Sequence, residues 1–145
     1  MSFDLGKFES ASFRFREEDI PVPELKAFFG EGEKPVWRIR NLTGMEIFIV
    51  AEAMERNNRK NEAVEAIMSG DRKERVDAVK ELVMTLPGKT PTEYVRRLET
   101  LCLGSVEPKV TKEIAVKIGE NFGNALTHLT NRILTLTLQG AEPGK

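Results

Sequence analysis

The sequence has few cysteine and histidine residues, which often act as metal ligands or catalytic groups. Its 145 residues include one cysteine, Cys102, and one histidine, His128. A single cysteine cannot form an internal disulfide or a zinc cluster, so we expect no metal and a reducing compartment, the cytoplasm. Cys102 is interpreted as a small hydrophobe on the apolar side of a helix, and His128 as a residue at a helix surface or interface.

Catalytic motifs and an excess of charge are also absent. The sequence has no phosphate-binding glycine loop, dinucleotide fingerprint or Gly-x-Ser-x-Gly turn, so we expect no cofactor and no enzyme activity. Lys and Arg number 22 against 23 Asp and Glu, which gives no electrostatic attraction to nucleic acid or to an anionic membrane surface. Residues 1–6 lack a signal-peptide pattern, and the most apolar stretch, residues 122–138, contains Arg132 and is not expected to span a membrane.

Apolar residues are nevertheless abundant enough to form a core. Leu, Ile, Val and Phe make up 40 of the 145 residues, and a chain of this length typically forms one domain. Eight of the ten aromatic residues lie at or before Phe48, which indicates a differently built N-terminal section. We predict a mainly α fold, a compact helical domain with a small N-terminal β element. The single domain, residues 1–145, would comprise a β-containing section (1–42), a helical section (43–139) and a flexible tail (140–145).

The N-terminal section combines alternating side chains with turn residues. Residues 13–16 and 36–40 alternate apolar and polar side chains, which predicts two half-buried strands. Between them, Pro23 suits the first position of a short helix over 24–29. The connection between the two strands is too long for a tight hairpin.

From Thr43 onward the pattern is helical. Thr43 and Glu46 form a capping box, which predicts a helix over 44–57. Since more than one side of this helix is apolar, we expect it to be largely enclosed, and Asn57 and Asn58 favour a break after it. Further helices are predicted over 59–68, 71–86, 90–103, 111–118 and 124–139, with a loop over 105–109 and a break at Gly119 and Gly123.

The last predicted helix carries a coiled-coil-like seam. Its apolar residues follow one another at alternating spacings of four and three, and few charges interrupt them. The seam suits either ordinary core packing or a surface for another protein, because the centres of interfaces are depleted in charge. The same two interpretations apply to the aromatic-rich N-terminal section, and the apolar surplus is compatible with self-association. The candidate partner-binding residues are Phe122, Leu126, Leu129, Ile133 and Leu136.

Residues 111–132 partly match a helix-turn-helix motif, which gives an alternative function. Ala115 and Gly119 have the spacing of the first helix and turn of such a DNA reader. The second half departs from the pattern, because Ala125 and His128 stand where branched apolar residues are usual. Arg132 is the only basic residue apart from His128 in that second half, against the several phosphate and base contacts of typical readers. A DNA-binding regulator is therefore the alternative interpretation. An enzyme is the third, ranked below it.

Several segments resemble the short form of tail assembly chaperones of tailed phages and prophages. They are IPVPELKAFF (20–29), EKPVWRIRNLTGME (33–46) and LTNRILTLTLQG (129–140), followed by EPGK (142–145). The resemblance implies a small, mainly helical, non-enzymatic protein in the bacterial host cytoplasm. Such a protein would keep the tape-measure protein soluble and help the tail-tube protein to assemble around it. In many members a programmed frameshift near the end appends a second domain, and Gly144-Lys145 can be encoded by a slippery run.

Overall fold

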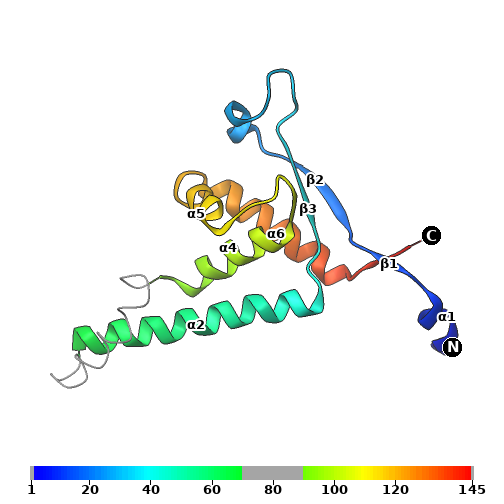
Figure 1. Cartoon of the computed structure of the whole chain (residues 1–145), viewed down its shortest axis with the longest axis horizontal. Coiled ribbons are helices and arrows are strands. Elements are labelled where there is room, and N and C mark those ends of the chain that lie inside the picture. The colour runs from blue at the N-terminus through cyan, green and yellow to red at the C-terminus, as the bar shows by residue number, and fades with distance from the viewer. Residues whose placement is uncertain (1, 70–89, 145) are drawn as a thin grey trace.

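The computed structural model describes residues 2–69 and 90–144, and the side chains of residues 68 and 69 are not among those described. The helix predicted over 71–86 lies outside the described residues. Within them the fold is mainly α with a small β element, which confirms the predicted fold class. Figure 1 shows the helices gathered beside a narrow sheet, with the N-terminal residues extending away from both.

A three-stranded antiparallel sheet forms one side of the molecule, in the order β2-β3-β4. Strand β2 (Glu17–Pro21) pairs with β3 (Val36–Arg40), so that Ile20 lies opposite Trp37. Strand β4 (Ser105–Glu107) pairs with the other edge of β3. Trp37 and Ile39 are buried as the alternation over 36–40 predicts.

Two of the three strands of this sheet were not predicted. Strand β2 lies in an acidic stretch, yet Ile20 is buried, and Pro21 is tolerated because it ends an edge strand. Strand β4 occupies part of the predicted loop over 105–109. Its first residue, Ser105, is buried and accepts a hydrogen bond from Trp37 Nε1 at 3.0 Å, while its own hydroxyl donates to the Leu101 carbonyl at 2.6 Å.

The longest helix, α2 (Gly44–Ser69), has no break at Asn57 and Asn58. Asparagine disfavours helices when its side chain bonds to the backbone nearby. Here the Asn57 amide instead donates to the Thr90 carbonyl at 2.7 Å and to Thr92 Oγ1 at 3.2 Å. The two predicted helices over 44–57 and 59–68 are therefore one helix, and its asparagines hold the start of the next described helix, α4 (Thr92–Gly104).

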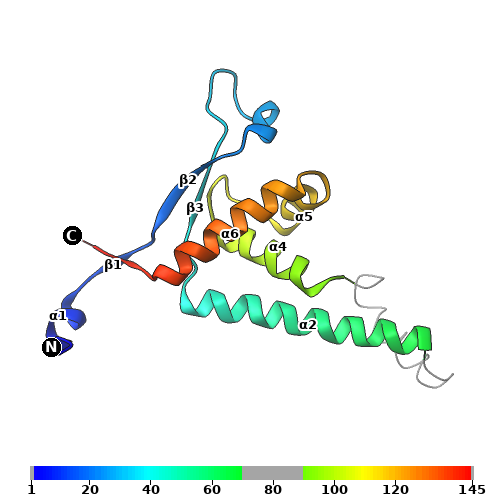
Figure 2. The same ribbon diagram turned by 180° about the vertical axis from the view of Figure 1, so that it is seen from behind.

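The core is centred on the last helix. Helix α5 (Lys112–Asn121) ends just before α6 (Gly123–Gln139) begins, which confirms the predicted break at Gly123. The break predicted at Gly119 was wrong, because Gly119 lies within α5. Helix α6 packs against β3 and α4, and α4 packs in turn against α2. Figure 2 views the molecule from behind and shows α6 crossing in front of α4.

The first turns of α2 are not enclosed, contrary to the expectation from the sequence. Met45 and Phe48 are 75% and 76% exposed, and Ile49 is also exposed. Among the described residues, the helix packs mainly against α4, and its buried residues include Val50 and Ala53. Apolar residues elsewhere on its circumference therefore remain at the surface.

Residues near the C-terminus pair with the N-terminal section in a small two-stranded ribbon. Strand β1 (Phe13–Arg14) pairs with β5 (Glu142–Pro143), so part of the expected flexible tail is a strand. The predicted strand over 13–16 is shorter than expected, and its Phe13 and Phe15 are exposed rather than half-buried. Before it lies a short helix, α1 (Leu5–Ser10), which has no buried residue.

Candidate binding groove

The seam residues of α6 lie mostly inside the folded chain. Leu126, Leu129, Ile133 and Leu136 are between 0% and 7% exposed. They belong to one buried cluster with residues of β3 and α4. In this fold the seam is core, so the four buried side chains present no surface to a partner. Phe122, the fifth candidate, is half-buried and lies at the edge of a groove.

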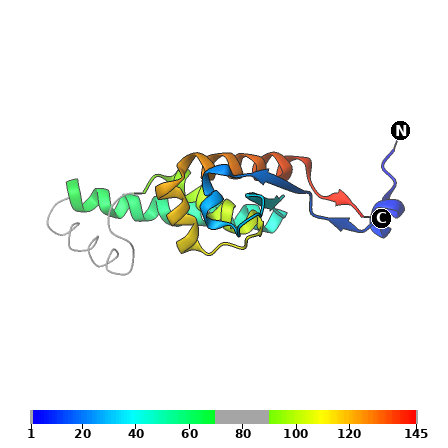
Figure 3. The ribbon, with the colours of Figure 1, turned by 90° about the horizontal axis from the view of Figure 1, so that it is seen from above.

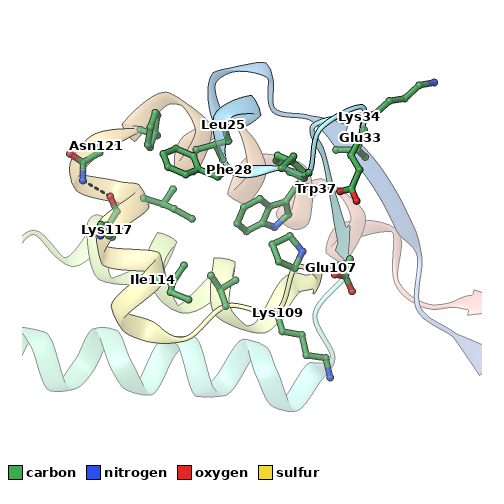
Figure 4. A pocket seen from close by; sticks show the side chains of 17 residues that line it. Leu25, Phe28, Glu33, Lys34, Trp37, Glu107, Lys109, Ile114, Lys117 and Asn121 are labelled. Carbon is green, nitrogen blue, oxygen red and sulfur yellow. Dashed lines mark hydrogen bonds between the residues drawn. The ribbon is translucent and has the colours of Figure 1, made fainter.

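This groove lies between the short helix η1 (Pro23–Phe28), the loop after β4 and helix α5. It has a volume of about 880 Å³ and a mainly apolar lining. Figure 4 shows Trp37 at its base, with Leu25 and Phe28 on one side and Ile114 on another. We refer to it as the η1–α5 groove. Its apolar lining consists of Leu25, Phe28, Phe29, Val36, Trp37, Pro108, Val110, Ile114, Ile118 and Phe122.

Local structure explains why η1 presents an aromatic side chain here. Pro23 lies at its start, and Leu25 is buried in the core and anchors it. Phe28 is three residues further along and is 76% exposed. Its ring meets that of Phe122 edge to face, with the centroids 6.3 Å apart. The two rings therefore link η1 to the junction of α5 and α6.

The rim of the groove carries charges of both signs. Lys34, Lys109 and Lys117 are exposed, as are Glu33 and Glu107. Figure 4 shows Lys34 and Lys109 reaching outward from the apolar base. The described residues that line the groove include no histidine, cysteine, serine or aspartate. This arrangement suits an apolar ligand flanked by charges better than it suits a small polar substrate.

Cys102 and His128 lie outside the groove. Cys102 is half-buried against the core, and burial raises the pKa of its thiol, which keeps it in the unreactive protonated form. His128 is exposed on α6, as the interpretation of a helix-surface histidine predicts. Neither residue lines the groove.

The second half of the segment that resembles a helix-turn-helix has little cationic surface, although Lys112 and Lys117 are exposed in its first half. Arg132 donates to both carboxylate oxygens of Glu18, at 3.2 Å and 2.7 Å, so its guanidinium is already paired. Ala115 is fully buried in the core. The exposed residues of α6 over 123–139 include no lysine, arginine, aspartate or glutamate. A major-groove reader needs phosphate-binding cations at this position, and this helix offers few.

Sequence reasoning missed most of the groove, although a signal for it was present. Phe28 and Trp37 belong to the aromatic-rich N-terminal section, which suggested either core or surface. In the structure Trp37 is buried at the base of the groove, whereas Phe28 is exposed at its side. Ile114 is 47% exposed on α5, and its spacing with Ala115 and Ile118 predicted only a helix over 111–118.

Comparisons of the chain with protein-family models, curated proteins and solved structures give no match. Among the described residues, no helix combines the length and apolar character that crossing a bilayer requires.

Proposed function

We propose that this protein is a non-enzymatic tail assembly chaperone of a phage or prophage, working in the bacterial host cytoplasm. It would keep the tape-measure protein soluble and assist the tail-tube protein to assemble around it. The resemblance of residues 20–29, 33–46, 129–140 and 142–145 to the short form of these chaperones suggests the role. The main structural support for the proposal is the η1–α5 groove, which offers an apolar surface to a client.

The groove suits one apolar face of an amphipathic helix. Phe28 and Ile114 are 76% and 47% exposed on its two sides, so a client side chain placed between them would bury apolar area on both. The rim lysines and glutamates lie where the polar face of such a helix would begin. A tape-measure protein is a long helical protein, so it offers repeated apolar faces that aggregate when left uncovered.

The start of α2 is a second exposed apolar surface, and it serves as the control. Phe48 is 76% exposed, the same fraction as Phe28, but it lies on α2 and does not line the groove. Replacing either phenylalanine by aspartate removes the same exposed ring and adds the same charge. A difference between the two variants therefore reports on position, and not on general surface hydrophobicity.

The test is co-expression of the chain with the tape-measure protein from the same genome, followed by measurement of the soluble fraction of that client. We expect the wild-type chain to raise this fraction and Phe48→Asp to match it. Phe28→Asp should lower client affinity by about 2 kcal/mol, the typical cost of removing an anchoring aromatic residue, or roughly 30-fold in Kd. A wild-type chain that leaves the client insoluble would contradict the chaperone role. Equal solubilisation by all three chains would place the client surface outside the groove.

A further inference from the structure

The N-terminal arm, defined here as residues 2–15, displays an apolar ridge that no described part of its own chain covers. Phe3, Leu5 and Phe8 are 69%, 72% and 53% exposed. The rings of Phe3 and Phe8 are 5.3 Å apart, and those of Phe8 and Phe13 are 5.4 Å apart. Since a helix of six residues is only marginally stable alone in water, α1 needs a surface to pack against.

The arm is directed away from its own groove. Figure 1 and Figure 3 both show α1 and β1 extending from the body on the side opposite to α5. The ribbon holds this direction, because the Gly144 amide donates to the Ser12 carbonyl at 2.8 Å and Arg14 Nε donates to Glu142 at 3.1 Å. Arg16 Nε also donates to the Gly140 carbonyl at 2.9 Å. A segment held in one direction loses less conformational entropy when it docks.

The groove and the arm complement each other in chemistry. Both are apolar and aromatic at their centres, so each would cover surface that the other leaves exposed. The groove rim carries three lysines and two glutamates, whereas α1 and its N-cap carry Asp4, Glu9 and Lys7. The rim therefore carries one more lysine than glutamate, and α1 with its N-cap carries one more acidic than basic side chain. Arg14, the remaining charged residue of the arm, is paired with Glu142.

We propose that α1 of one molecule docks in the η1–α5 groove of a second copy of this chain. Phe3, Leu5 and Phe8 would pack over Phe28 and Ile114. The arm and the groove are different surfaces of one molecule, so the contact joins copies head to tail and produces either a closed ring or an open chain. The contact itself is independent of the proposed function. One consequence rests on that function: the arm of a neighbour covers the groove until a client helix displaces it.

The test is sedimentation velocity of the full chain over a range of concentrations, without any client. We expect the wild-type chain and Phe48→Asp to associate as concentration rises. Leu5→Asp and Phe28→Asp should each weaken association by at least about tenfold in Kd, because each places a carboxylate at the centre of the contact. All the replaced side chains are more than 70% exposed, so we expect each variant to fold, and circular dichroism checks this.

A mixture of the two deficient variants gives the sharper result. Leu5→Asp retains an intact groove and Phe28→Asp retains an intact arm, so an equimolar mixture can form one arm–groove contact. We expect the mixture to form a one-to-one dimer and no larger species. The proposal is overturned if the wild-type chain stays monomeric, if both variants associate like the wild type, if Phe48→Asp alone abolishes association, or if mixing restores nothing. These results leave the co-expression result unaffected, so failure of one proposal is distinguishable from failure of the other.

Discussion

The seam of α6 and the first turns of α2 are held in place by different interactions. The seam is held by apolar packing, since Leu129 and Ile133 are fully buried against β3 and α4. The start of α2 is held by polar contacts, while Met45 and Phe48 face outward. Both regions have apolar residues at helical spacing. Such spacing predicts an apolar face of a helix, but it does not predict whether another element covers that face.

The polar contacts at the start of α2 form a small network. The Thr43 amide donates to Glu46 Oε1 at 2.9 Å, and Thr43 Oγ1 accepts from the Glu46 amide at 3.1 Å, which confirms the predicted capping box. Arg40 donates to both carboxylate oxygens of Glu46, at 2.7 Å and 2.8 Å. Its guanidinium also lies 4.1 Å from the centre of the Phe15 ring. The network therefore joins β3, α2 and the base of the arm.

The largest effect should come from removing volume in the seam. Leu129→Ala leaves a cavity at a fully buried site, and we expect it to lower the free energy of unfolding by about 2–5 kcal/mol. Phe48→Ala removes a larger side chain from an exposed site and should change the free energy of unfolding by less than about 0.5 kcal/mol. Urea unfolding of both variants measures the difference. Similar losses in the two variants would show that the start of α2 is also held by apolar packing.

A smaller effect should come from adding volume next to the seam. A Cβ at Gly104 would lie 2.7 Å from Ile133 Cδ1 and 2.8 Å from its Cγ2. Gly104→Ala should therefore overpack the contact between α4 and α6, with a net loss of about 1–2 kcal/mol after the gain in helix propensity. Gly44→Ala is the matched control, because nothing lies within 4 Å of its added Cβ, and it should be neutral or stabilising. A second change, Ile133→Val, should recover part of the Gly104→Ala loss if the clash is its cause.

Local signals predicted where several helices begin and end, whereas the other elements depend on tertiary contacts. Capping by Thr43 and the break near Gly123 depend on neighbouring residues, so both could be predicted from the sequence. Strand β4 and the unbroken course of α2 depend on partners far along the chain, such as Trp37 for Ser105 and Thr90 for Asn57. A pattern within one helix carries no information about such partners.

The candidate site shows the same limit. The seam of α6 could be predicted as an apolar stripe, but its burial depends on where α4 and β3 lie. The groove combines Phe28 from η1 with Ile114 from α5, residues that only the fold brings to one place. The excess of aromatic residues before Phe48 indicated the region but not the surface.

The smallest effect should be a dependence on pH at the start of α2. The hydrogen bonds from Arg40 are the main cause that lowers the pKa of Glu46 below its ordinary value of 4.5, and desolvation opposes them. Because the pKa is lower in the folded state, ionised Glu46 stabilises the fold above pH 4.5, and this contribution is lost as the pH falls through the folded-state pKa.

Glu46→Gln tests this contribution, because it keeps the side-chain shape and removes the charge. We expect the variant to be less stable than the wild type by about 1 kcal/mol at neutral pH, since the pair is only partly buried. The difference should shrink as the pH falls below about 4.5, where the wild-type carboxyl becomes protonated. Urea unfolding of both chains across this range gives the difference at each pH, which cancels the titration of the other carboxylates. A difference that stays constant with pH would show that Glu46 acts through its shape and hydrogen bonds alone. Leu129→Ala should behave in that constant way, because its loss is one of packing and involves no proton.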